Sequence, residues 1–304
     1  MGMHLIPVHL LGKILPLLGN PGEKKLLTLG VQDCHFTYDQ AISLFKRHGI
    51  PHTPLKLKEI QLTTGFKWAP PSESKRYQRF LHQNTLFRML GFEQKNIHAM
   101  DINSFEGADL VHDLNMPVPD LLRSQFDFVY DGGTSEHVFS SKDCLFNLCA
   151  MAKVGGLIVN ASPCDYINHG FVNFNAEFFR DCFGTNGFEE IYVKYIARPK
   201  VTPRAGQHYL EFSPDAFRYS LAPYYLTEVF SVYRKIEERP LRIPQQGLYR
   251  SLWAGGGRTI VATNRHALGN YVREMARDIV DHSFLLSAIV RPYMALNRAK
   301  KVFL

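Results

Sequence analysis

Short apolar runs alternate with amphipathic segments along residues 24–200 of the chain. The first run, "KKLLTLG", ends at Gly30, and the apolar positions of residues 36–50 then follow the spacing of a helix. Further apolar runs lie at 96–102 ("NIHAMDI") and 126–130 ("FDFVY"). Strands separated by single helices are typical of βαβ units. The pattern therefore predicts an α/β fold, with a largely parallel sheet and helices on both faces.

The remaining periodic segments extend this pattern. Three have helical spacing: 75–90, which Gly91 ends, 141–156, which Gly155 and Gly156 close, and 175–188. Two more read as strands, "LIVNASP" at 157–163 and "EEIYVKYIA" at 189–197, and "GADLVHDLN" at 107–115 reads as a strand edge or loop. Residues 51–75 contain four prolines and are expected to form a loop.

The pattern loosens beyond residue 197. Residues 198–257 are rich in aromatic and basic side chains and predict an insertion that covers a site or makes a subunit contact. "RTIVAT" at 258–263 then reads as a last strand. The tail, 265–304, predicts broken helical structure, either a docking helix or a membrane-surface contact.

Residues 1–23 form an apolar N-terminal segment ahead of the main domain, 24–264. Pro7, Pro16 and Lys13 interrupt its apolar stretch, and it has no small-residue cleavage site. It therefore fits neither a signal peptide nor a membrane span. We expect it to pack on the domain or on a neighbouring subunit, so a homo-oligomer stays an open alternative.

Composition narrows the class of protein. The 304 residues are 45% hydrophobic and 21% charged, which is ordinary for a globular protein. The formal net charge of +7 favours acidic ligands, but Lys and Arg are spread along the chain and no nucleic-acid-binding module is recognisable. The five cysteines form no C-x-x-C pair, which favours a reduced, cytoplasmic protein. No His/Cys spacing is typical of a zinc site, and no metal is expected.

Acidic residues stand at or just beyond the ends of several expected strands: Asp33, Asp101, Asp113 and Asp131. Gly132 and Gly133 follow the last of them, and glycine lets the backbone approach a ligand closely. The carboxyl ends of parallel strands are where open α/β sheets bind ligands. Carboxylates there can accept hydrogen bonds from a ribose diol or an amino group.

Five motifs occur in an order that resembles a known family: "LLTLGVQD", "IHAMDI", "VHDLN", "FDFVYDGGTSEHV" and "MAKVGGLIVNASP". Over about residues 24–200 they look like the successive motifs of class I S-adenosylmethionine-dependent methyltransferases. The resemblance implies a seven-stranded Rossmann-like methyltransferase sheet with helices on both faces. Residues 187–197 and 256–263 would be its antiparallel sixth and seventh strands, with the insertion between them and a helical tail after them.

The resemblance also implies roles for individual residues. Gly30 would pass under the methionine part of S-adenosylmethionine, and Asp33 would contact its ammonium group. Asp101 would bind the two ribose hydroxyls, while Asp113 and Leu114 would hold the adenine. Asp131 and Gly132 would face the sulfonium and the incoming nucleophile.

His137 and His169 are candidates for the base that takes a proton from the acceptor, with packing or structural hydrogen bonds as the alternative. The implied acceptor is a small molecule. The first motif departs from the family, because Thr28 replaces an acid and Gln32 and Cys34 stand where glycines are usual. A catalytically inactive binding or assembly module is therefore the alternative function.

Overall fold

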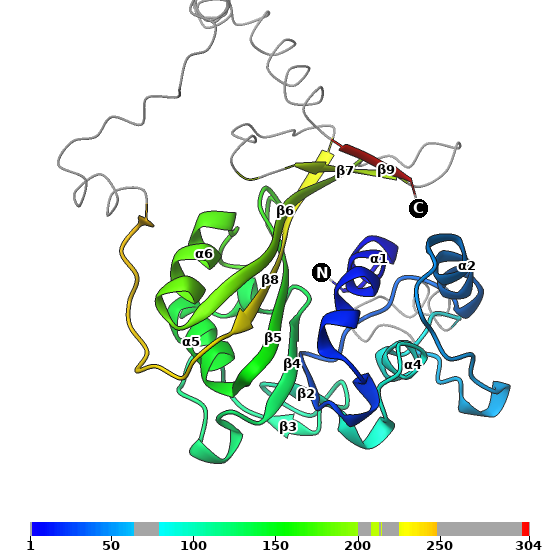
Figure 1. The fold of residues 1–304 in the computed structure, drawn as a ribbon, viewed down its shortest axis with the longest axis horizontal. Helices are drawn as coiled ribbons and strands as arrows, with labels where there is room; N and C mark the ends of the chain where they lie inside the picture. The colour runs from blue at the N-terminus through cyan, green and yellow to red at the C-terminus, as the bar shows by residue number, and fades with distance from the viewer. Residues whose placement is uncertain are drawn as a thin grey trace, which may run out of the picture.

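A nine-stranded mixed sheet forms the centre of the computed structural model, in the order β3-β2-β1-β4-β5-β8-β6-β7-β9 (Figure 1). The structure describes residues 2–63, 79–199, 208–212, 214, 225–247 and 300–303. The strands are β1 (Leu26–Leu29), β2 (Ile97–Asp101), β3 (Leu110–Val111), β4 (Phe126–Asp131), β5 (Ala152–Pro163), β6 (Phe188–Pro199), β7 (His208–Phe212), β8 (Tyr225–Lys235) and β9 (Lys300–Phe303).

Helices cover both faces of this sheet (Figure 1). Those described are α1 (Leu5–Ile14), α2 (Tyr38–His48), α4 (Gln83–Met89), α5 (Ser141–Met151) and α6 (Ala176–Thr185). Short 3₁₀ turns occur at Leu15–Leu18, Pro21–Glu23, Leu57–Glu59, Gln94–Asn96, Asp120–Leu122 and Ser135–His137, the last labelled η6. Helices α5 and α6 lie on one face, and α1, α2 and α4 lie on the other.

The two faces of the sheet bury different residues because neighbouring side chains of a strand point to opposite sides. On β4, Phe128 and Tyr130 join the core that contains α1, α2 and α4, while Val129 joins the core under α5 and α6. On β5, Leu157 and Ile158 divide in the same way. The near-continuous apolar runs of the sequence thus correspond to strands buried on both faces.

The predicted α/β class is confirmed, and the first five strands give the sheet a Rossmann-like half. Strands β1 to β5 pair in the order β3-β2-β1-β4-β5, and every pairing among them is parallel. The chain order reverses between β1 and β4, which is the switch point where doubly wound sheets bind ligands.

The expected count of seven strands was wrong, because the sheet has nine within the described residues. The insertion expected over 198–257 is also not irregular throughout. Strand β8 lies inside that segment and runs antiparallel between β5 and β6. Its sequence was hard to recognise because Thr227, Glu228 and Ser231 are buried polar residues that interrupt the apolar run. Strands β7 and β9 then extend the sheet beyond β6. The strand expected at 256–263 lies outside the described residues.

Three predicted helix boundaries also need correction. The helix expected from 75 begins at Gln83, since residues 79–82 form a turn and short bridges, and 75–78 lie outside the described residues. Helix α5 stops at Met151, and β5 begins directly at Ala152. Gly156 belongs to this strand, where a Cβ would lie 2.9 Å from the carbonyl oxygen of Lys153. Residues 300–303 of the expected helical tail form strand β9, and most of the tail lies outside the described residues.

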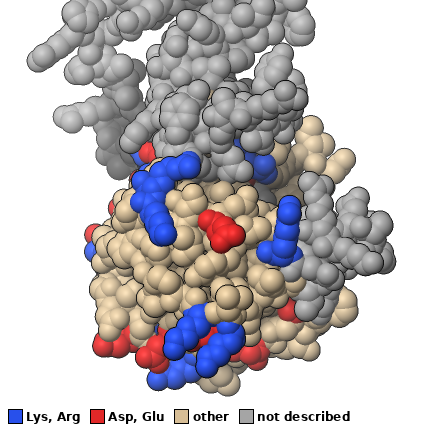
Figure 2. All heavy atoms as spheres, turned by 90° about the vertical axis from the view of Figure 1, so that its right-hand side faces the viewer, with Lys and Arg blue, Asp and Glu red and all other residues tan. Residues whose placement is uncertain are grey.

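The N-terminal segment packs into the same core as the sheet. Most of α1 is buried, and the backbone of Met3 pairs with Asp33 and His35 at 2.7 and 2.8 Å. Within the described residues, no helix combines the length and the apolar character needed to cross a membrane. The charges on the face that includes α2 are dispersed: Lys and Arg there form separate small groups, with uncharged surface and an acidic group between them (Figure 2).

Glu228 on β8 interacts with residues from three other parts of the chain, His4, Tyr166 and Arg198. Its Oε1 lies 3.3 Å from His4 Nε2 and 3.1 Å from Arg198 Nε, and it accepts a hydrogen bond from the Tyr166 hydroxyl. Burial alone would raise the pKa of the Glu228 carboxyl, but His4, Arg198 and the Tyr166 hydrogen bond outweigh it and lower the pKa to about 2.

We predict that Glu228→Gln lowers the free energy of unfolding by about 3 kcal/mol at pH 7. Because the folded pKa lies below the ordinary value of 4.5, this stabilisation is present above pH 4.5 and is lost as the pH falls toward about 2. Urea unfolding of both proteins between pH 7 and pH 2 measures the difference. The control is Glu189→Gln, whose exposed pair with Arg234 should contribute less than about 1 kcal/mol. A loss for Glu228→Gln that does not change with pH would contradict the prediction.

Candidate functional site

The ends of β1, β2 and β4 converge on Gly30. This residue has a φ of +71°, which favours glycine, and its N–H donates to the carbonyl of Met100 at 2.7 Å. A Cβ on Gly30 would lie 3.1 Å from Thr134 Oγ1 and 3.7 Å from Asp101 Oδ2. The structure therefore brings together Gly30 and Asp101, two of the residues that the sequence placed in one site.

Asp101 is half-buried at the end of β2. Its Oδ1 accepts a hydrogen bond from the N–H of Ile102 at 2.6 Å, and its Oδ2 is the oxygen nearest Gly30. Within the described part of the chain, Oδ2 accepts no hydrogen bond from the protein. This oxygen is thus available to a donor on a ligand.

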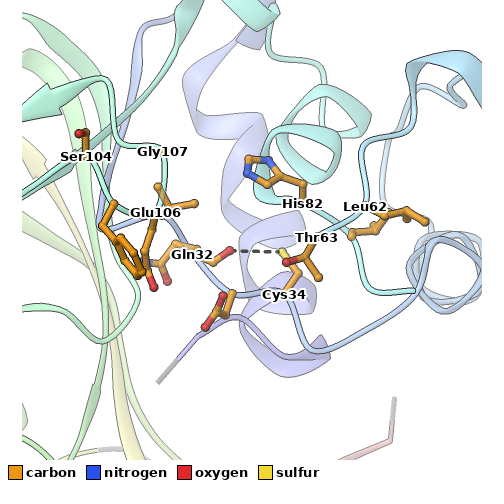
Figure 3. Close-up of a pocket in the computed structure, with 12 residues that line it drawn as sticks. Gln32, Cys34, Leu62, Thr63, His82, Ser104, Glu106 and Gly107 are labelled. Atoms are coloured by element: carbon orange, nitrogen blue, oxygen red, sulfur yellow. Dashed lines mark hydrogen bonds between the residues drawn. The ribbon is translucent and has the colours of Figure 1, made fainter. Parts of the chain in front are cut away.

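A cavity of about 430 Å³ opens beside these strand ends (Figure 3). Segments from different parts of the chain line it: 31–34 after β1, 104–107 after β2, and the pairs 62–63 and 81–82. Its polar lining includes Asp33 and Glu106, and its apolar lining includes Leu62 and Phe105. The size is in the range of pockets that take small organic ligands.

Side-chain hydrogen bonds hold the loop that follows β1, where the resemblance would place glycines. Gln32 turns inward, where its Nε2 donates to the carbonyl of Leu29 at 2.6 Å and its backbone N–H donates to Gln83 Oε1 at 2.7 Å. The Thr28 hydroxyl donates to the carbonyl of Gly30 at 2.8 Å. Cys34 is fully buried, and burial raises the pKa of its thiol, so it remains protonated.

Asp131 is fully buried at the end of β4, and its carboxylate is turned into the protein. It accepts hydrogen bonds from the N–H groups of Thr134 and Ser135, from the Ser135 hydroxyl and from Asn160 Nδ2. Its two oxygens therefore hold the turn that follows the strand. Gly132, the next residue, lies beneath the side chain of Gln32.

Asp113 and Leu114 follow β3 and differ in burial. Asp113 is exposed, and its Oδ1 accepts hydrogen bonds from the backbone and side chain of Asn115, which lower the pKa of its carboxyl. Leu114 is 5% exposed and packs in the core under α5 and α6, so its side chain offers little surface to a ligand.

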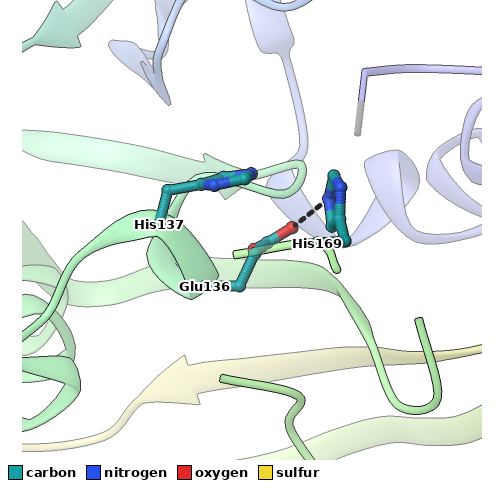
Figure 4. A group of neighbouring side chains, drawn as sticks. All are labelled: Glu136, His137 and His169. Carbon is teal, nitrogen blue, oxygen red and sulfur yellow. Dashed lines mark ion pairs between the residues drawn. The ribbon is translucent and has the colours of Figure 1, made fainter. Parts of the chain in front are cut away.

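The structure also brings His137 and His169 together, with Glu136 between them (Figure 4). One possible ligand atom from each of the three side chains lies within 4.8 Å of the others, and His169 Nε2 is 3.4 Å from Glu136 Oε1. Glu136 is fully buried, His169 is half-buried, and His137 is exposed. Sequence reasoning selected both histidines but missed Glu136, although "SEH" places it next to His137.

Burial sets the protonation of this cluster. Burial, together with the neighbouring Asp131 carboxylate, raises the pKa of the Glu136 carboxyl to about 8. Partial burial lowers the pKa of both His137 and His169. Both imidazoles are therefore neutral at neutral pH.

Comparison with known proteins gives similar structures but no close relative. No protein family model matches the chain, and no curated protein matches it. Among solved structures, TehB from Haemophilus influenzae is 11% identical, with a TM-score of 0.32, over 49% of this chain and 52% of that one. A SAM-dependent methyltransferase from Aquifex aeolicus is 12% identical, with a TM-score of 0.33, over 72% of this chain and 87% of that one.

A third similar structure is the methyltransferase CalH in complex with SAH, which is 14% identical, with a TM-score of 0.35, over 75% of this chain and 54% of that one. The match thus spans about half the length of TehB and of CalH. Two of these three structures, the Aquifex aeolicus protein and CalH, are named as methyltransferases. With TM-scores below 0.5, none of these similarities assigns a function.

We predict that Gly132→Ala destabilises the protein by about 1–3 kcal/mol, because the new methyl group would overlap Gln32 Oε1 and lie 2.5 Å from the ring of the buried Tyr130. Gly184→Ala on α6 is the control. A Cβ there meets nothing within 4 Å, and alanine is the better helix former by about 1 kcal/mol, so this change should stabilise. Thermal and urea unfolding measure both; equal effects of the two changes would refute the close approach at Gly132.

Proposed function

We propose that this protein transfers a methyl group from S-adenosylmethionine to a small-molecule acceptor. The observation that carries the proposal is the convergence of Gly30, Asp101 and the adjacent cavity at the switch point of a Rossmann-like sheet. Ligands of such sheets bind at this point, outside the carboxyl ends of the strands.

Residues at or after the ends of β1, β2 and β3 suit the charge and the hydroxyl groups of this cofactor. Asp101 Oδ2 is placed to accept hydrogen bonds from ribose hydroxyls, and Asp33 lines the cavity where it can meet an ammonium group. The exposed Asp113 is available to an adenine amino group. The positive φ and missing side chain of Gly30 let the backbone pass close beneath the ligand.

The bound cofactor would supply an activated methyl group on a sulfonium, and catalysis would consist mainly of positioning. Asp131 contributes by holding the turn that begins at Gly132 and carries His137. His137 ends that turn, His169 lies in the loop after β5, and the acceptor would bind beside them. Either imidazole is neutral there and can take a proton from an acceptor hydroxyl.

One observation favours the alternative of a non-catalytic binding module. The Gln32 side chain occupies the space above Gly132, where the resemblance would place the reacting end of the cofactor. Cofactor binding to the folded protein separates the two functions.

We predict that calorimetric titration gives micromolar binding of S-adenosylmethionine and of S-adenosylhomocysteine. Asp101→Ala should weaken both by more than about 10-fold, because removing a charged hydrogen-bond partner costs about 1.5–3 kcal/mol. The control is Asp39→Ala, an exposed acid on α2 that should leave both affinities unchanged. Absence of binding to folded wild-type protein would refute the proposed function and favour the module.

A further inference from the structure

We propose that Glu136, His137 and His169 form a binding site for one divalent transition-metal ion. The three side chains offer two imidazole nitrogens and a carboxylate oxygen within 4.8 Å of one another. Two histidines and one carboxylate are a recurring ligand set of zinc and non-haem iron centres that keep open positions.

The buried carboxylate is the observation that points to a ligand. Glu136 is 0% exposed, and neither of its oxygens accepts a hydrogen bond within the described chain. His169 Nε2, which faces it, is also buried without a hydrogen bond. Polar groups left unsatisfied in a protein interior are costly, and a cation between these atoms would satisfy both.

The spacing suits a shared ion. Glu136 Oε1 and His169 Nε2 are 3.4 Å apart, which is too long for a strong hydrogen bond. Two ligands that each bind one metal at about 2.0–2.2 Å in tetrahedral geometry are separated by roughly this distance. The ligand atom of His137 lies within 4.8 Å of the other two, and because this residue is exposed, the site can be reached from solvent.

The backbone that carries these ligands is fixed before any ion binds. Glu136 and His137 lie in η6. The first residue of this turn, Ser135, donates hydrogen bonds to the Asp131 carboxylate from both its N–H and its hydroxyl. The loop that carries His169 is fastened to the same turn, because the N–H of Phe171 donates to the carbonyl of Glu136 at 2.7 Å.

Gly170 makes this approach of the two segments feasible. It has a φ of +71°, and a Cβ there would lie only 2.6 Å from the carbonyl oxygen of Glu136. This contact keeps His137 and His169, which are far apart in sequence, close to the carboxylate of Glu136.

The donor set selects the kind of ion. Imidazole and carboxylate together suit Zn²⁺, Fe²⁺ and Co²⁺, whereas Ca²⁺ and Mg²⁺ favour sites built from oxygen ligands. With the ion bound, both imidazoles are ligands and no longer bases. The ion would instead bind an oxygen of the acceptor at an open position and lower the pKa of its hydroxyl. This role in selecting hydroxylated acceptors rests on the proposed function; the metal site itself does not.

The test is titration of the full chain, without a histidine tag, with Co²⁺ and then Zn²⁺. Visible ligand-field absorption of Co²⁺ and calorimetry should both show one ion per chain, with Zn²⁺ displacing Co²⁺. Glu136→Gln and His169→Asn should each weaken binding by more than about 100-fold, since losing even an outer partner of a metal ligand costs 10–100-fold. His137→Asn alters an exposed residue and should lower affinity without affecting folding.

The matched control is His98→Asn, which removes an imidazole 2.6 Å from the carboxylate of Asp109, outside the cluster. It should leave Co²⁺ binding unchanged. No stoichiometric binding to folded wild-type protein, or binding that survives all three cluster variants, would overturn the metal site. S-adenosylmethionine is titrated separately, without metal. Absence of S-adenosylmethionine binding would contradict the proposed function, whereas absence of Co²⁺ binding would contradict the metal site, so the two results are distinguishable.

Discussion

The buried carboxylate of Asp131 is the interaction on which the arrangement of the site depends. It ends the central strand β4 and accepts four hydrogen bonds, three of them from Thr134 and Ser135. Those bonds place the Thr134 hydroxyl against the carbonyl of Leu29, at 2.6 Å, and so join the end of β4 to the end of β1. They also set the direction of η6, and with it the positions of Glu136 and His137.

Much of the fold could be predicted from the sequence, because strands buried on both faces give continuous apolar runs and helices give a different period. Strands β1, β2 and β4 and helices α2 and α6 are where the pattern placed them, whereas β5 begins at Ala152, ahead of the expected start at 157. The pattern failed at β8, where Glu228 is paired with Arg198 and His4 in the core and so does not mark an exposed position. It also failed at Gly156, a glycine that serves a close approach of strands and not a helix end.

The site could be predicted only in part. Asp101 and Gly30 lie at strand ends, and the parallel order of the sheet brings such ends together, so their proximity follows from topology. The meeting of Glu136 with His169 depends instead on a loop whose course is set by the contact of Gly170 with the Glu136 backbone. No periodicity encodes such a contact. The inward turn of Gln32 is likewise a tertiary effect, since its partners are the Leu29 carbonyl and Gln83.

The conformation of the loop that follows β1 depends on contacts with Gln83, a residue of helix α4. Its Oε1 accepts a hydrogen bond from the Gln32 N–H and lies 3.3 Å from the Thr28 hydroxyl oxygen, so one side chain of α4 contacts the loop on both sides of Gly30. A loop rich in glycine owes its shape to its own backbone freedom, but this one takes its shape from a separate helix. Residues Leu81 and His82, just before α4, also line the cavity. A shift of α4 would therefore move the loop around Gly30 and the cavity wall at Leu81 and His82 together.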